Sequence, residues 1–153
     1  MKRLFVAAAL AALVGGVVLA QSSDPQVGTW KLNAEKSRGT MFAGGTVKVE
    51  AAGEAMKTTV DLVRKDGSAG KWSFTAQPDG KEYGVTGDNP FGDTISVTRA
   101  DARTLKVTLK NAGKVTATQT VAVSADGKTR TITTKGTNVK GEPIDSMTVY
   151  ERQ

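Results

Sequence analysis

The residue types that most often carry out catalysis or bind transition metals are missing from this chain. Its 153 residues include no histidine and no cysteine. Serine–histidine–aspartate and cysteine–histidine pairs are therefore excluded, and so is an imidazole base. Sites for zinc, copper and non-haem iron normally use imidazole or thiolate ligands, and a histidine-ligated haem needs imidazole. We therefore expect a protein that is not an enzyme and that holds no metal ion and no cofactor.

The carboxylates do not suggest a different catalytic or metal site. The 15 aspartate and glutamate residues fall mainly in turns and at positions that point outward, where charged groups are ordinarily solvated. The segment 88–93, Asp-Asn-Pro-Phe-Gly-Asp, lacks the alternating oxygens and the distal glutamate of an EF-hand loop. We expect a tight loop there, with Phe91 either tucked in or exposed. An enzyme that uses carboxylates or tyrosine stays open as an alternative.

A group of polar and aromatic side chains is better suited to binding than to catalysis. Gln119 lies among apolar neighbours on one face of an alternating run, and a buried unpaired amide is costly. Gln119 should therefore meet a ligand, a water molecule or a partner such as Thr148 or Tyr150. The other candidate ligand-binding residues are Trp72, Phe74, Tyr83, Arg130, Thr148 and Tyr150.

Strands must position these side chains, because no window beyond residue 20 has convincing helical periodicity. Short alternating runs separated by Gly, Asp, Asn and Pro predict about ten strands instead. The predicted strands span residues 27–32, 46–50, 56–63, 71–77, 81–85, 94–99, 104–110, 114–124, 129–136 and 144–152.

The connections between these runs predict how the strands are arranged. Three of them contain Asp-Gly, at residues 66–67, 79–80 and 126–127, and Asn111-Ala112-Gly113 forms a fourth. Asp and Gly favour the tight turns of β-hairpins. Consecutive hairpins give an antiparallel meander, and a long meander removes its exposed edges by closing. The sequence therefore predicts an all-β fold, a single up-and-down antiparallel β-barrel over residues 21–153.

The first 20 residues have the features of a signal peptide. Lys2 and Arg3 precede an uncharged run over residues 4–19, and Val18-Leu19-Ala20 puts small residues at the −3 and −1 positions of a cleavage site. The run is shorter than the roughly 20 residues of a spanning helix. We therefore expect cleavage after Ala20, a periplasmic or secreted protein, and no membrane insertion after cleavage.

The charge pattern is that of an ordinary soluble surface. The chain has 21 Lys and Arg against 15 Asp and Glu, a net charge of +6. The charges are interspersed, and the longest basic run past the leader is Arg64-Lys65. Few aromatic residues lie beside the basic ones, which argues against base stacking. We expect no nucleic-acid partner, and we expect a monomer.

Two short motifs resemble those of the calycin barrels, the lipocalins and the intracellular fatty-acid-binding proteins. They are the opening run Gly28-Thr29-Trp30-Lys31-Leu32-Asn33 and the closing run Val149-Tyr150-Glu151-Arg152. The opening run, with Lys36-Ser37 after it, is also similar to that of small exported bacterial proteins described as lipocalin-like.

The resemblance has implications for individual residues. It implies that Gly28 and Trp30 are the structural signature and that Trp30 closes one end of the barrel. It also implies that an arginine from late in the chain packs against this tryptophan, for which Arg130 and Arg99 are the candidates. Fatty-acid-binding proteins hold the ligand carboxylate with Arg-x-Tyr in the last strand. Here Tyr150 matches that motif, whereas a threonine stands in place of the arginine.

These observations leave two interpretations of the function. The expected inward residues, among them Val60, Val107 and Thr134, are mostly small or medium-sized, and interior space grows with strand number, so a partly hollow barrel should bind a small apolar or amphipathic molecule. Alternatively, Met41-Phe42 fills the interior. The second interpretation is a protein-interaction barrel, such as a periplasmic enzyme inhibitor or envelope accessory, that contacts its partner through the Pro90-Phe91 loop.

Overall fold

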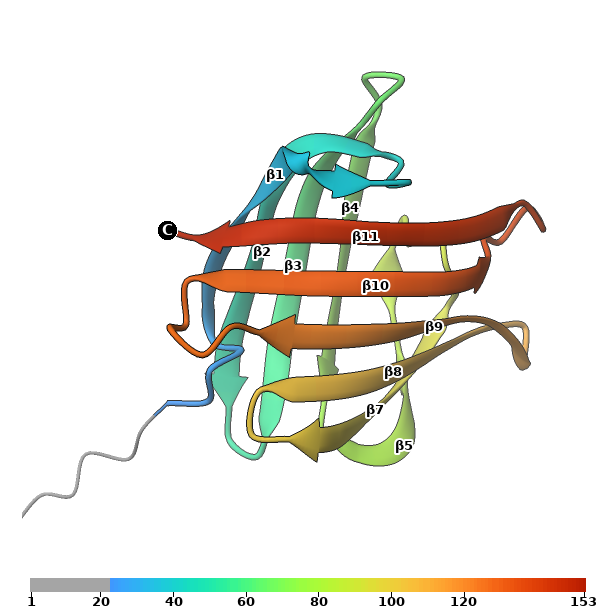
Figure 1. Ribbon diagram of the computed structural model, residues 1–153. Coiled ribbons are helices and arrows are strands. Elements are labelled where there is room, and N and C mark those ends of the chain that lie inside the picture. Colours follow the sequence, from blue (N-terminus) through green and yellow to red (C-terminus); the bar gives the residue numbers. More distant parts are fainter. Residues whose placement is uncertain (1–22) are drawn as a thin grey trace, which may run out of the picture.

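The computed structural model describes residues 23–153, which form one sheet of eleven antiparallel strands (Figure 1). The strands are β1 (Gly28–Arg38), β2 (Phe42–Ala52), β3 (Ala55–Arg64), β4 (Ala69–Ala76), β5 (Asp79–Gly84), β6 (Thr86–Gly87), β7 (Thr94–Asp101), β8 (Thr104–Asn111), β9 (Lys114–Val123), β10 (Thr129–Thr137) and β11 (Pro143–Arg152). Residues 23–153 contain no helix that is long and apolar enough to cross a membrane. The predicted signal peptide, residues 1–20, lies outside the described residues.

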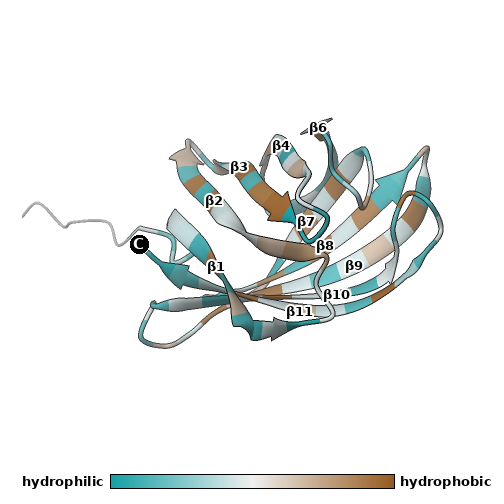
Figure 2. Ribbon diagram, turned by 90° about the horizontal axis from the view of Figure 1, so that it is seen from above, coloured by the Kyte–Doolittle hydropathy of each residue, from teal (hydrophilic) through white to brown (hydrophobic). Residues whose placement is uncertain are grey.

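The strand order confirms the predicted antiparallel meander. Neighbouring strands follow the order β5-β7-β8-β9-β10-β11-β1-β2-β3-β4-β6. The first and last strands pair with each other, with Leu32 opposite Tyr150. Figure 2 shows how the sheet bends so that β1–β4 and β8–β11 face each other. The fold is therefore a single all-β antiparallel barrel.

The expectation of full closure is wrong, because two strand edges stay unpaired. Strands β5 and β6 lie at the two ends of the sheet order. The predicted Asp79-Gly80 hairpin turn does not form, because these residues are the first two of β5, and Asp79 pairs with Thr98 of β7. Strand β4 ends at Ala76 and pairs with the two-residue β6 rather than with β5. Asp79 Oδ1 still accepts the Lys81 amide at 3.0 Å, but this local hydrogen bond does not decide which strands pair.

The other two Asp-Gly turns are hairpins, as predicted. Asp66 joins β3 to β4 and accepts the Ser68 amide at 2.9 Å, and Asp126 joins β9 to β10 and accepts the Lys128 amide at 3.0 Å. Hydrogen bonds from the Ser68 side chain and amide lower the pKa of Asp66. The glycine that follows Asp66 has a φ of 87°, which few other residues adopt.

Strand β1 is longer than the sequence predicts, because its second half does not alternate. The register between β1 and β11 shifts between Asn33 and Arg38. Within this irregular stretch, the Ser37 hydroxyl donates to the Asn33 carbonyl at 2.7 Å and accepts the Val149 amide at 2.9 Å. Side-chain hydrogen bonds thus hold the strand where the regular ladder is interrupted, and such bonds leave no periodic signal.

Trp30 lies at the end of the barrel where the described chain begins. Its side chain is fully buried, and Nε1 donates to the Gln26 carbonyl at 3.0 Å. The arginine that covers the ring is Arg152, with its guanidinium carbon 4.2 Å from the ring centroid, a cation–π contact. Neither Arg130 nor Arg99 takes this place. The β1–β11 register decides the matter, because it sets Trp30 directly opposite Arg152.

Gly28 is needed at this end because Arg152 lies against it. A Cβ atom on Gly28 would collide with Arg152 Nη1, and the φ of Gly28 is 147°. Arg152 also donates to the carbonyls of Val27 at 2.7 Å and Pro25 at 2.9 Å. The Gly-x-Trp spacing therefore places two residues against the Arg152 guanidinium: Gly28, which has no side chain to collide with it, and Trp30, whose indole ring contacts it.

Candidate ligand-binding cavity

The barrel encloses a cavity of about 360 Å³. This volume lies within the range of small-molecule sites, about 300–1,000 Å³. One end of the cavity, here called the inner end, lies at Gln26 and Arg130. The opposite end, here called the outer end, is lined by Thr40, Asn138 and Asp145, next to the β1–β2 and β10–β11 connections. The barrel is therefore partly hollow.

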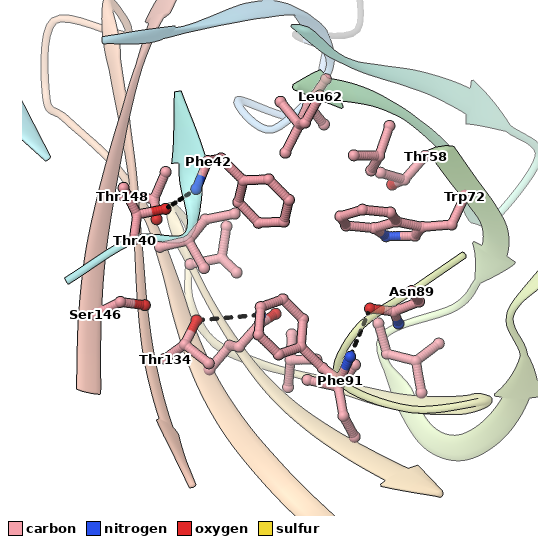
Figure 3. A pocket seen from close by; sticks show the side chains of 18 of the residues that line it. Thr40, Phe42, Thr58, Leu62, Trp72, Asn89, Phe91, Thr134, Ser146 and Thr148 are labelled. Carbon is pink, nitrogen blue, oxygen red and sulfur yellow. Dashed lines mark hydrogen bonds between the residues drawn. The ribbon is translucent and has the colours of Figure 1, made fainter. Parts of the chain in front are cut away.

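Phe42 narrows the cavity without filling it. Its ring is buried and packs against Trp72, with a centroid separation of 5.8 Å and an interplanar angle of 41°. Phe91 enters from the loop before β7 and is also buried, so the tucked-in alternative for this loop is the one observed. Figure 3 shows the three aromatic rings around the central space. They give the cavity a large apolar contact surface.

Strands β2, β3, β4, β7 and β8 make an apolar wall. Its aliphatic and aromatic residues come from the inward positions of each strand, as alternation predicts. They are Phe42, Val47, Val49, Met56, Val60, Leu62, Trp72, Phe74, Ala76, Ile95, Val97, Leu105, Val107 and Leu109.

Strands β9, β10 and β11 make a wall of different chemistry. Six of its inward residues are polar: Gln119, Arg130, Thr134, Ser146, Thr148 and Tyr150. One side of the cavity can therefore form hydrogen bonds along its length, whereas the facing side offers mainly apolar contacts.

Arg130 lies at the inner end of this polar wall. It is buried, and its Nε donates to Gln26 Oε1 at 3.0 Å. Its Nη1 is buried without a hydrogen-bond partner among the described residues. Burial lowers the pKa of Arg130 to about 10, so the guanidinium stays positively charged at neutral pH. A buried charged donor without an acceptor is costly, which makes Nη1 the least satisfied group of the described interior.

Tyr150 lies beside Arg130 and supplies a second polar group. The two residues are directly opposite each other in the β10–β11 ladder, and Tyr150 is also buried. Burial raises the pKa of its hydroxyl to about 12, so the hydroxyl stays protonated at neutral pH. A protonated phenol is able to donate a hydrogen bond. The inner end of the cavity is therefore suited to a hydrogen-bond acceptor, best of all a negatively charged one.

Six of the seven residues predicted to bind ligand line this cavity: Trp72, Phe74, Gln119, Arg130, Thr148 and Tyr150. Tyr83 does not line it. Tyr83 lies on the edge strand β5, half-buried, and its hydroxyl donates to Asp79 Oδ2 at 2.8 Å. That hydrogen bond raises the pKa of Tyr83.

Gln119 has a partner other than those expected. Its Nε2 donates to Thr134 Oγ1 at 3.2 Å, rather than to Thr148 or Tyr150. The β9–β10 register explains the choice, since Thr134 is directly opposite Gln119.

Two residues of the site were missed by sequence reasoning. Ser146 is two residues before Thr148 on the same strand face, so alternation along β11 indicates it once the strand is placed. Gln26 precedes β1 and belongs to no alternating run. It is 1% exposed, and its Nε2 donates to Arg103 O at 3.0 Å and to Val121 O at 3.4 Å. Nothing in the sequence indicates its role.

The described residues include no group of three or more Asp, Glu, His or Cys residues that could hold a metal ion. Comparison with models of known protein families gives no match, and comparison with curated proteins gives none either. The antiparallel barrel is therefore the level at which the structure classifies this chain, and the resemblance to lipocalins and fatty-acid-binding proteins stays a prediction.

Gln26 is expected to stabilise the fold by holding Arg130. Gln26→Met removes the acceptor of Arg130 Nε and the donor to Arg103 O, so the free energy of unfolding should fall by about 2–3 kcal/mol. Arg130→Met in the same chain removes the orphaned charge, so the double variant should lose less than the sum of the two single variants. Chemical denaturation of all four proteins measures this coupling. Strictly additive changes would show that Gln26 and Arg130 act independently.

Proposed function

We propose that this protein binds a small amphipathic molecule inside the barrel, with the anionic or acceptor-bearing end of that molecule at Arg130. The observation that carries the proposal is Arg130 Nη1, a buried donor without a partner at the inner end of a largely apolar cavity. A carboxylate placed there would accept from Nη1 and from the Tyr150 hydroxyl. Such charge-assisted hydrogen bonds are about twice as strong as neutral ones.

The rest of the cavity supports the same class of ligand. A hydrocarbon body would contact Phe42, Trp72 and Phe91, and its removal from water is favourable in proportion to the area buried, about 25 cal/mol per Å². Gln26 fixes Arg130 through Nε, so Nη1 is held in place before the ligand arrives. A preorganised site loses less free energy to ordering on binding.

The localisation follows from the predicted leader. Removal of residues 1–20 during export would place the binding reaction in the periplasm or outside the cell.

The alternative function, a protein partner at the Pro90-Phe91 loop, stays a prediction. Phe91 points into the cavity, and the Val139 amide donates to the Pro90 carbonyl at 2.9 Å, so the loop packs against the β10–β11 connection. No contact among the described residues favours this alternative over small-molecule binding.

Titration with the anionic fluorophore 1-anilinonaphthalene-8-sulfonate tests the proposed function. We expect saturable binding at one site. Thr58→Phe places a ring in the cavity and should weaken that binding at least about 10-fold. Thr59→Phe is the matched control, because Thr58 is buried and lines the cavity whereas Thr59 is exposed on the same strand. Absence of saturable binding, or equal effects of the two substitutions, would contradict an internal site.

A further inference from the structure

Building on the proposed function, we infer that the ligand carries a second polar group, such as a hydroxyl, on its chain far from the anionic end. Thr134 and Ser146 bind that group near the outer end of the cavity. The ligand class is therefore a hydroxylated amphiphilic acid rather than an acid with a plain hydrocarbon tail.

The β10–β11 ladder arranges its inward residues in three successive rows. Arg130 is opposite Tyr150, and Thr134 is opposite Ser146. Between these two rows, Ile132 is opposite Thr148. Residues two apart on a strand face the same side, and the rise is about 3.3 Å per residue. The outer row is therefore about 13 Å from the inner row along the strands.

The residues of the polar wall are largely buried, but their hydroxyls are only partly paired. Thr134 is 2% exposed and accepts from Gln119 Nε2 at 3.2 Å. Ser146 and Thr148 are each 6% exposed. Within residues 23–153, neither of these two hydroxyls forms a hydrogen bond with another residue, although both side chains line the cavity. The wall therefore presents unused donors and acceptors toward whatever occupies the cavity.

The position of these hydroxyls relative to the apolar wall distinguishes two kinds of ligand. Figure 3 shows Thr134 and Ser146 on one side of the space and Leu62 and Trp72 on the other. A plain alkyl chain would satisfy the apolar wall but would separate the hydroxyls from water, which costs free energy. A chain with a hydroxyl at the height of Thr134 and Ser146 restores those hydrogen bonds. Sites built to hydrogen-bond a substrate hydroxyl discriminate strongly against the analogue that lacks it.

Three twelve-carbon acids test the inference by isothermal titration calorimetry, because an extended chain of this length roughly matches the separation of the rows. They are dodecanoic acid, 12-hydroxydodecanoic acid and 2-hydroxydodecanoic acid. We expect the 12-hydroxy acid to bind about 5- to 10-fold more tightly than dodecanoic acid, as one added hydrogen bond implies. The 2-hydroxy acid should gain nothing, because its hydroxyl stays beside the carboxylate.

The double variant Thr134→Val/Ser146→Ala should remove the preference for the 12-hydroxy acid over dodecanoic acid. Thr133→Val, which removes a hydroxyl from the opposite face of β10, is the control and should keep the preference. Equal affinity of the wild type for dodecanoic and 12-hydroxydodecanoic acids would show that Thr134 and Ser146 bind only water. That result would overturn the inference of a second polar group but not the proposed function. If none of the three acids binds, both the inference and the proposed function are contradicted.

Discussion

Replacing Trp30 with alanine is expected to lower the free energy of unfolding by about 3–5 kcal/mol, the cost of truncating a large aromatic residue in a core. The indole is fully buried, and its removal leaves the Gln26 carbonyl without its donor. Arg152 would also lose the ring over which it lies. Urea denaturation followed by circular dichroism measures the change.

Trp72→Ala is the matched control for Trp30→Ala. Trp72 is only partly buried and faces the cavity, so its truncation removes fewer contacts and should cost clearly less. A cost below about 1 kcal/mol for Trp30→Ala would contradict the role of Trp30 in closing the barrel.

Arg130→Met is expected to weaken the binding of dodecanoic acid about 30-fold or more, with little change in the free energy of unfolding. Truncating one partner of a buried, hydrogen-bonded charge pair typically costs at least about 2 kcal/mol of binding. In the unliganded protein the same substitution removes a buried charge whose Nη1 has no partner, which favours folding, and it leaves Gln26 Oε1 without its donor, which opposes folding, so the net change in stability should be small. The combination of lost binding and retained stability separates a binding residue from a structural one.

Two comparisons check that the charge of Arg130 is responsible. Dodecanol lacks the carboxylate, so Arg130→Met should change its affinity far less. Arg99→Met removes a partly exposed guanidinium that pairs with Asp24, and it should leave dodecanoate binding unchanged. Equal losses for dodecanol and dodecanoic acid would rule out a role for the charge.

The charge of Arg130 also predicts how binding depends on pH. The pKa of Arg130 is lowered to about 10, so its positive charge is present below that pH and is lost above it. The affinity of the wild type for dodecanoate should therefore fall as the pH rises past about 10.

The sequence predicted the inner surface of the barrel well, because one rule governs it. Alternation placed Val60 and Val107 inside, and both are buried. It also brought six of the seven candidate ligand-binding residues to one cavity. Tyr83 is the exception, because alternation assigns a face to a residue but does not show that its strand lies at an open edge.

Features that depend on contacts between distant segments were not predictable in this way. The Asp79-Gly80 sequence looks like that of the hairpin turns elsewhere in the chain, yet both residues belong to β5, which pairs with β7. The placement of Arg152 over Trp30 depends on the register of the first and last strands. Gln26 acts through a segment that is not a strand at all, and it joins that segment to Arg130, 104 residues further on.

A crystal structure of the protein with dodecanoic acid tests the central claim most directly. We predict the carboxylate within about 3 Å of Arg130 Nη1 and the chain inside the barrel along Phe42 and Trp72. A carboxylate directed to solvent at the outer end of the cavity, or an acid bound only on the outer surface of the sheet, would contradict it.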